Sequence, residues 1–385
     1  MMQLENFDPA FFLKQYWQKK PLLIHAGFTH FQDPVTPDEL AGLAMEESIE
    51  SRIICDQNAD HHWQVRHGPF NEEDFPSFDK NWTLLVQAVD HFLPEVAELL
   101  SAFRFIPDWR TDDVMISYAA DGGSVGPHFD NYDVFLIQGH GQRRWQIGQY
   151  CQADEPLLTN NSLKILSDFR CTEEFLMEAG DILYLPPCIA HWGVAVGEAL
   201  TYSVGFRAPS HSELVSHWSD YVLANLVSKS HLKDPELSAD SNPGEIGGNN
   251  LEHMKALLKK LLTDNDAMED WFAQLMTQPK YLQGDVSEID ISSSELPIDL
   301  DSLLRDGGDL YRSGDCRLAF IRHQKYHALY ANGDRLNSEL ASTAFIEYLC
   351  QEKLLNSTHL VEYIGNANNR TVLQSLLARN CFYVD

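Results

Sequence analysis

Two short segments of the sequence carry side chains whose types and spacing could bind a metal ion. In the first, GPHFDNYDV, His128 and Asp130 stand two residues apart. On a strand, side chains alternate between the two faces, so this imidazole and this carboxylate would point to the same side and could share one metal. Taken alone the pair is a weak indication, because a surface histidine beside a turn aspartate has the same spacing.

A third candidate ligand follows 63 residues after His128, in the segment GDILYLPPCIAHWG. His191 comes there just after a strand-like apolar run and a Pro-Pro turn. Two histidines and one carboxylate form the facial triad of non-haem iron(II) oxygenases, which leaves adjacent coordination positions open. We therefore predict that His128, Asp130 and His191 bind Fe(II), with room for a bidentate 2-oxo acid and O2. The alternative for His191 alone is a packed histidine beside Trp192.

The next strand-like segment, GHGQRRWQIG, offers a cation for the distal carboxylate of such a cosubstrate. Alternation sends Arg143 to the same apolar face as Trp145 and Ile147, and Arg144 to the other face. Arg143 is therefore the candidate, because a guanidinium binds a carboxylate bidentately and stays charged. Two solvated surface arginines are the alternative. Ser117, in the strand-like DVMISYAA, could add a hydroxyl to the same carboxylate.

Short strands between residues 50 and 205 must position these side chains. Gly, Pro and Asn punctuate them, which is typical of an antiparallel barrel or sandwich. We expect helices at 37–47 and 81–102 to pack on its outside, and the N-terminal segment to form a helix, a turn and a strand. The predicted strands are SRIICDQ, WQVRHG, DVMISYAA, YDVFLIQG, RRWQIG, DILYLPP and LTYSVGF.

The pattern changes near residue 209. SELVSHWSDYVLANLVSK, LEHMKALLKKLLTDN and DAMEDWFAQLMTQ have helical periodicity, and an acidic loop at about 232–250 separates the first from the second. The tail mixes short strands with helices, as a winged-helix module does. We predict an α+β protein with a catalytic domain at 1–209, a helical region at 210–278 and a winged-helix-like domain at 279–385.

Composition limits the partners of the chain. Its 385 residues include 57 Asp+Glu and 28 Lys+Arg, for a formal net charge of -29. Such a surface repels phosphate backbones and attracts basic proteins. Residues 280–385 hold 15 Asp+Glu and 10 Lys+Arg, so direct nucleic-acid binding by the winged helix is not expected. The seven scattered cysteines indicate reduced thiols in the cytoplasm, and neither a membrane span nor a signal peptide is evident.

The sequence resembles the JmjC-type, cupin-like ribosomal oxygenases of bacteria. The resemblance extends across the chain and is carried by the triad, by GPHFDNYDVFLIQGHGQRRWQIG and GDILYLPP, and by the N-terminal FLKQYWQKKPLLIHAGF. It implies a double-stranded β-helix (jelly-roll) barrel with flanking helices, a helical dimerisation region and a C-terminal winged helix. The chain is expected to be a homodimer.

The resemblance also implies an activity and the residues that serve it. The triad would bind Fe(II), and Arg143 would bind the C5 carboxylate of 2-oxoglutarate, with Ser117 as a second contact. The expected substrate is an arginine of a basic ribosomal protein, large-subunit protein L sixteen. Tyr132 and Asn131 stand next to the H-x-D pair in the sequence and could line its pocket. The same chemistry on a histidine or an N-methylated side chain is an alternative. Another is a non-catalytic winged-helix binding protein with a vestigial barrel.

Overall fold

The computed structural model of the chain describes residues 3–56, 63–75, 80–159, 163–226, 231–235, 244–263, 265–281 and 300–384. Part of the predicted acidic loop, 236–243, lies outside these residues. The structure divides into two compact units. One contains residues 1–208 and 313–315, and the other contains 209–312 and 316–385. The predicted three-part division into 1–209, 210–278 and 279–385 stays a prediction.

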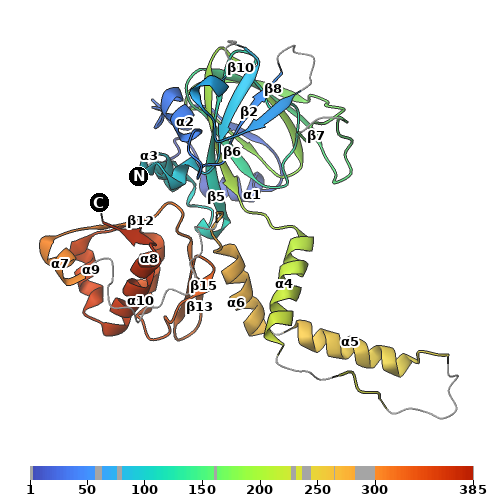
Figure 1. The fold of residues 1–385 in the computed structure, drawn as a ribbon, viewed down its shortest axis with the longest axis vertical. Helices are drawn as coiled ribbons and strands as arrows, with labels where there is room; N and C mark the ends of the chain where they lie inside the picture. The colour runs from blue at the N-terminus through green and yellow to red at the C-terminus, as the bar shows by residue number, and fades with distance from the viewer. Residues whose placement is uncertain are drawn as a thin grey trace. The chain divides into compact units, whose positions relative to one another are not determined.

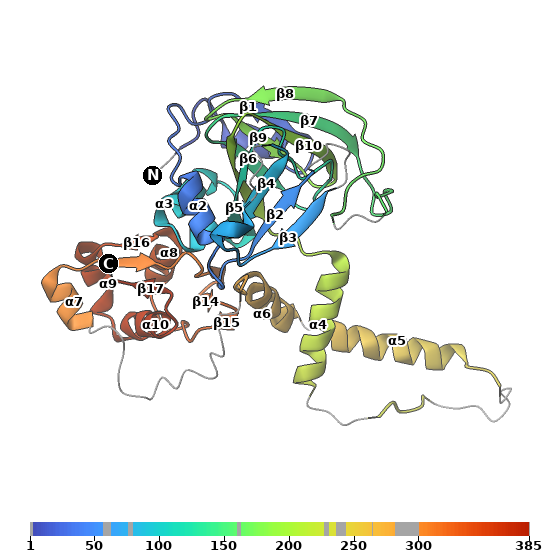
Figure 2. The same ribbon diagram turned by 45° about the horizontal axis from the view of Figure 1, so that its top comes forward.

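Two antiparallel sheets build the first unit (Figures 1 and 2). The larger has the strand order β1-β9-β6-β11-β5-β4-β2-β3, and the smaller has the order β10-β7-β8. Backbone bridges from the segment after β5 to β10 join them, which closes a barrel. The strands are β1 (Leu22–Ile24), β2 (Ser51–Cys55), β3 (Gln64–His67), β4 (Trp82–Val86), β5 (Thr111–Ala119), β6 (Val134–Gln138), β7 (Gln142–Tyr150), β8 (Glu173–Met177), β9 (Ile182–Leu185), β10 (Ile189–Val196) and β11 (Ala199–Phe206).

The central strands are buried on both faces of the sheet, so their sequences are unbroken runs of apolar residues. On the outer face of the large sheet, Ile116 and Phe135 pack in one core with Phe12 of α1 (Pro9–Gln15) and Leu40 of α2 (Pro37–Leu43). On the inner face, Leu136, Leu183 and Trp145 form a second core inside the barrel. The strands predicted from the sequence are all present, as are the N-terminal helix and the helix near 37–47.

Two local predictions were wrong. Residues 82–86 form strand β4, where a helix over 81–102 was expected, and only short helices follow it: η2 (Val89–His91), α3 (Pro94–Ala97) and η3 (Glu98–Phe103). The run WTLLV is apolar throughout because β4 lies between β2 and β5 and is covered on both faces, so its sequence shows no alternation. His128 and Asp130 do not belong to a regular strand either; they lie in the loop between β5 and β6.

The second unit begins with helices α4 (His211–Asn225), α5 (Gly248–Leu262) and α6 (Asn265–Met276). Asp270 of α6 accepts hydrogen bonds from Tyr330 and Arg335, which ties this helix to the strands beside it. One large apolar core fills most of the C-terminal part, and Ala328 and Tyr330 pack in a smaller cluster with Ala273 of α6. Its elements are α7 (Leu300–Asp306), β12 (Leu310–Arg312), β13 (Leu318–Arg322), β14 (His327–Ala331), β15 (Asp334–Arg335), α8 (Thr343–Gln351), β16 (Leu354–Leu355), α9 (Ser357–Ile364), α10 (Ala367–Ala378) and β17 (Phe382–Tyr383). No helix in the described ranges is both long and apolar enough to cross a membrane.

Candidate metal centre

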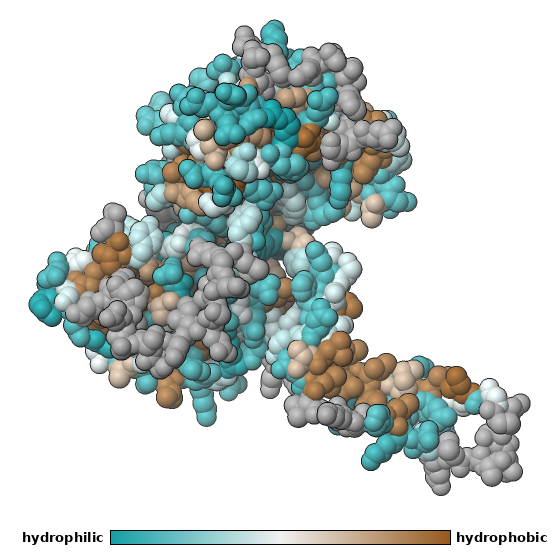
Figure 3. Space-filling view, viewed as in Figure 1, coloured by the Kyte–Doolittle hydropathy of each residue, from teal (hydrophilic) through white to brown (hydrophobic). Residues whose placement is uncertain are grey.

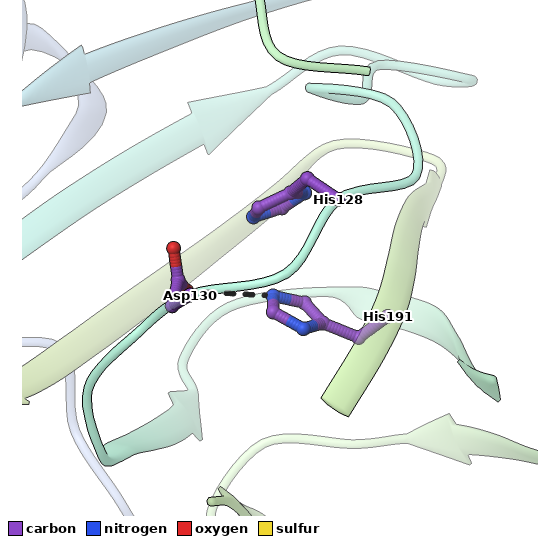
Figure 4. Close-up of side chains that lie close together, drawn as sticks. All are labelled: His128, Asp130 and His191. Carbon is purple, nitrogen blue, oxygen red and sulfur yellow. Dashed lines mark ion pairs between the residues drawn. The ribbon is translucent and has the colours of Figure 1, made fainter. Parts of the chain in front are cut away.

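The structure brings the three predicted ligands together inside the barrel. His128 and His191 form an antiparallel bridge, in which the His128 amide donates to the His191 carbonyl at 3.0 Å and the reverse bond measures 2.8 Å. Asp130 follows His128 in the loop, and its Oδ2 lies 3.7 Å from Nε2 of His191 (Figure 4). One ligand atom from each residue lies within 4.8 Å of the others, a spacing that can hold one metal ion.

Backbone carbonyls orient both imidazoles. Nδ1 of His128 lies 2.9 Å from the Gly126 carbonyl, and Nδ1 of His191 lies 2.9 Å from the Ile189 carbonyl. A carbonyl only accepts, so each Nδ1 carries the proton and each Nε2 presents its lone pair to the centre. Burial, together with the neighbouring His128 imidazole, lowers the pKa of His191 to about 4. The His191 ring is therefore neutral, which is the form of histidine that binds a metal.

A second layer of hydrogen bonds holds the loop that carries His128. Ser124 Oγ accepts from the Gly126 amide at 3.0 Å and from the Trp192 indole at 2.9 Å. Gly126 has a φ of 79°. A Cβ there would lie 2.6 Å from Cδ1 of Ile165, so the loop requires glycine. Ser124 thus links strand β10 to the carbonyl that orients His128. Sequence reasoning missed this residue, because its role depends on a partner 68 positions away.

The Asp130 end of the loop is anchored in a different way. The Asp130 carbonyl accepts from the Cys188 amide at 2.7 Å. The carboxylate of Asp133 is fully buried and accepts from the Tyr184 hydroxyl at 2.6 Å and from Gln18 Nε2 at 3.0 Å. These contacts fix the backbone on both sides of the candidate ligand. Asp133 was also missed, since nothing in the sequence indicates that its side chain turns inward.

Arg143 lies on the inner face of β7, as the alternation predicted. It is 3% exposed and is buried with Trp145 and Ile147, whereas Arg144 faces outward and binds Glu174 at 3.0 Å. Within the described part of the chain, Nε and Nη2 of Arg143 have no hydrogen-bond partner. Burial lowers the pKa of this guanidinium to about 10. A buried cation with free donors suits an anionic ligand, so this side chain meets the requirement of a dicarboxylic cosubstrate.

The other predicted site residues lie around the same interior or at its rim. Ser117 is buried on the inner face of β5, and its hydroxyl makes a long hydrogen bond of 3.5 Å to the Thr201 carbonyl. Tyr132 is 43% exposed and hydrogen bonds to Asp130. Desolvation and the Asp130 charge raise the pKa of this phenol. Asn131 is exposed, and its Oδ1 lies 3.8 Å from the Cys188 thiol.

Comparisons with known proteins agree with this architecture. A family model described as "JmjC domain" matches residues 98–214, and one described as "ROXA-like winged helix" matches residues 260–380. The barrel is therefore of the JmjC, cupin-like type, and the C-terminal part is a winged helix. This confirms the predicted fold class.

Full-length relatives and solved structures match as well. The chain is 39% identical to the ribosomal protein uL16 3-hydroxylase of Escherichia coli over 85% of each chain. It is 32% identical to a probable ribosomal oxygenase of Haemophilus influenzae over 99% of this chain and 95% of that one. The crystal structure of the Escherichia coli protein YcfD covers both chains completely with a TM-score of 0.87 and 34% identity. A YcfD structure in complex with cobalt and 2-oxoglutarate has a TM-score of 0.84 over 100% of this chain and 99% of that one. With its interior histidine-aspartate-histidine cluster and its winged helix, the chain belongs to the JmjC-domain ribosomal oxygenases of bacteria.

Proposed function

We propose that this oxygenase uses Fe(II), 2-oxoglutarate and O2 to hydroxylate an arginine side chain of ribosomal protein uL16 (L sixteen). The observation that carries the proposal is the pairing of two features in one barrel. A two-histidine, one-carboxylate cluster lies in the same interior as a buried arginine whose Nε and Nη2 are unpaired among the described residues. The cluster suits Fe(II), and the arginine suits the distal carboxylate of a 2-oxo dicarboxylate.

Each side chain has a defined part in this proposal. Iron held by the triad, with a 2-oxo acid beside it, supplies the activation of O2 that oxidises a C–H bond. His128, Asp130 and His191 bind the metal, and the Gly126 and Ile189 carbonyls keep the two imidazoles in the Nε2-ligating form. Arg143 binds and orients the cosubstrate. The apolar wall around Trp145 keeps water away from this end of the barrel.

The charge of the chain supports a basic protein substrate. A net charge of -29 attracts cationic proteins by long-range electrostatics, and ribosomal proteins are such partners. The Escherichia coli relative is named for uL16, which supports the same substrate here. Tyr132 and Asn131 lie next to Asp130 at the exposed rim, where an entering side chain would pass. The seven cysteines are free thiols, consistent with the reducing cytoplasm where ribosomes assemble.

The test incubates the purified protein with Fe(II), ascorbate, 2-oxoglutarate and recombinant uL16. We expect succinate to accumulate and one uL16 arginine to gain the mass of one oxygen atom. Both signals should disappear in the His128→Ala and Asp130→Ala variants. Succinate without a modified arginine, or with a modified histidine or N-methyl group, would contradict the arginine assignment. Absence of both signals from iron-loaded protein would contradict the enzymatic proposal and favour a binding protein.

We also propose that a second copy of the chain covers the apolar face of α5. Figure 3 shows hydrophobic side chains gathered along this helix. Its leucines are between 36% and 48% exposed, which is unusual for a soluble monomer. They are Leu251, Leu257, Leu258, Leu261 and Leu262. A two-fold axis would let each copy bury this face against the other.

Light scattering after size exclusion tests the homodimer. The wild type is expected at twice the chain mass of 43.8 kDa, and Leu258→Asp at the mass of one chain. Val361→Asp is the matched control, because Val361 of α9 is also an exposed apolar helix residue, at 54%. A monomeric wild type, or dissociation by both variants, would contradict the α5 interface.

A further inference from the structure

Besides Arg143 and the Trp145 indole, a buried hydroxyl of the barrel interior lacks a hydrogen-bond partner among the described residues. Thr83 of β4 is fully buried, and among the described residues its Oγ1 makes no hydrogen bond. Thr83 lies on the inner face of the large sheet, because Leu85, two residues along, packs in the interior cluster with Ile54. Buried hydroxyls are almost always hydrogen bonded, and leaving one unpaired costs free energy. This hydroxyl therefore requires a functional or structural explanation.

The strand registers place Thr83 close to Arg143. On the large sheet, Thr83 is the direct cross-strand partner of Ala119. On the small sheet, Arg143 is the direct partner of Ala195. Ala119 and Ala195 pack against each other in one buried cluster. The two strand positions are thus linked through a cluster of small alanine side chains, which places Thr83 and Arg143 at the same end of the barrel interior.

The distance to the metal ligands suits a dicarboxylate. Ala195 and His191 lie four residues apart on β10, about 13 Å along the strand. In the proposed complex the five-carbon acid lies within this interval, between the ligand cluster and the Arg143 guanidinium. The unpaired donors of the described residues at this end include the Arg143 guanidinium and the Thr83 hydroxyl.

We propose that Thr83 is a further anchor for the distal carboxylate of the cosubstrate, with its hydroxyl donating to a carboxylate oxygen that the Arg143 guanidinium also binds. This inference rests on the proposed function and adds a residue to it. Ser117 stays a predicted contact of the same carboxylate, because the bond of its hydroxyl to the Thr201 carbonyl is long, at 3.5 Å. Thr83 has no competing acceptor among the described residues, so a ligand oxygen is the partner that completes it.

The experiment measures binding of 2-oxoglutarate to Mn(II)-loaded protein by calorimetry, because Mn(II) takes the place of iron without turnover. Thr83→Val removes the hydroxyl and keeps the shape, and should weaken binding about tenfold to a hundredfold, the range for a hydrogen bond to a charged group. Thr83→Ser should restore wild-type affinity. Thr201→Val is the matched control: Thr201 is also buried, but its hydroxyl is already bonded to Gln138 at 3.3 Å, so cosubstrate affinity should not change.

A second ligand locates the effect on one end of the cosubstrate. 2-Oxopentanoate has the same five carbons and the 2-oxo acid group but lacks the distal carboxylate, so Thr83→Val should not weaken its binding. Unchanged 2-oxoglutarate affinity in Thr83→Val would overturn the inference, and so would equal losses in Thr83→Val and Thr201→Val or for both ligands. If the wild type itself fails to bind 2-oxoglutarate, the proposed function fails instead, and the wild-type titration distinguishes this case from the others.

Discussion

Replacing Arg143 by methionine should make the unliganded protein more stable and at the same time remove cosubstrate binding. The two effects have one cause, the burial of a cation whose Nε and Nη2 have no hydrogen-bond partner in the part of the chain that the structure describes. Desolvation lowers the pKa of this guanidinium from its ordinary value to about 10. A shift of that size corresponds to a cost of about 3 kcal/mol for the charged form.

The sign of the stability effect follows from linkage. A base whose pKa is lowered by folding binds fewer protons in the folded state at pH values above the lowered pKa of about 10. The cost of burying the charge is therefore relieved only above that pH. At pH 7.5 both states are protonated and the whole cost is present. Arg143→Met removes the charge and keeps an apolar chain beside Trp145, so the free energy of unfolding should rise by about 1–3 kcal/mol.

Urea unfolding at pH 7.5 measures this, first without ligands and then with Mn(II) and 2-oxoglutarate. The wild type should gain stability from the cosubstrate, and Arg143→Met should gain none, because two charge-assisted hydrogen bonds are lost, for a drop in affinity of about a hundredfold or more. Arg144→Met is the control, since Arg144 faces outward on the same strand. A less stable Arg143→Met apoprotein would refute the argument, because it would show that the protein itself satisfies the guanidinium.

Three further predictions concern the metal centre. Ser124→Ala should weaken Co(II) binding about tenfold, because the Ser124 hydroxyl holds Gly126, whose carbonyl orients His128. The visible absorption of bound Co(II) measures this affinity, and an unchanged affinity would contradict the role of Ser124. Gly126→Ala should lower the free energy of unfolding by about 1–3 kcal/mol, because its φ of 79° and the contact with Ile165 both disfavour a Cβ; an unaffected urea midpoint would count against it. The free energy of unfolding of the metal-free protein should fall as the pH is lowered from 6.5 towards 4. The reason is that His191 takes up a proton in the unfolded chain at a higher pH than in the folded chain. In His191→Ala this loss of stability should be smaller, and an equal loss would contradict the assignment to His191.

The sequence predicted the parts of the site that follow from local spacing. Alternation on one strand was enough to assign Arg143 to the interior and Arg144 to the surface, and burial agrees. The H-x-D pair was found by its spacing, although the reason given for it was wrong. Its loop is held extended by the bridge to His191 rather than by a regular strand. Strand β4 was mistaken for a helix because burial on both faces removes the alternation that identifies a strand.

Residues whose roles depend on register could not be predicted in this way. Thr83 shows the limit most clearly. Its own segment, WTLLV, contains nothing polar besides this one threonine, and its relation to Arg143 exists only through two strand pairings and an alanine contact between sheets. Ser124 depends likewise on Trp192, which is distant in sequence. Such relations are set by tertiary structure, and a single sequence carries no signal for them.

Strand β10 organises the whole candidate site, and this explains why residues so far apart can act together. Its His191 is a candidate ligand and pairs with His128, the turn just before it binds the Asp130 carbonyl, and its Ala195 lies opposite Arg143. One strand therefore fixes both the metal ligands and their distance from the cosubstrate cation. A change that shifts β10 by even one residue would turn His191 outward and bring Trp192 to the centre, because successive side chains face opposite sides. The register of β10 against β7 is thus as necessary to the site as the ligands themselves.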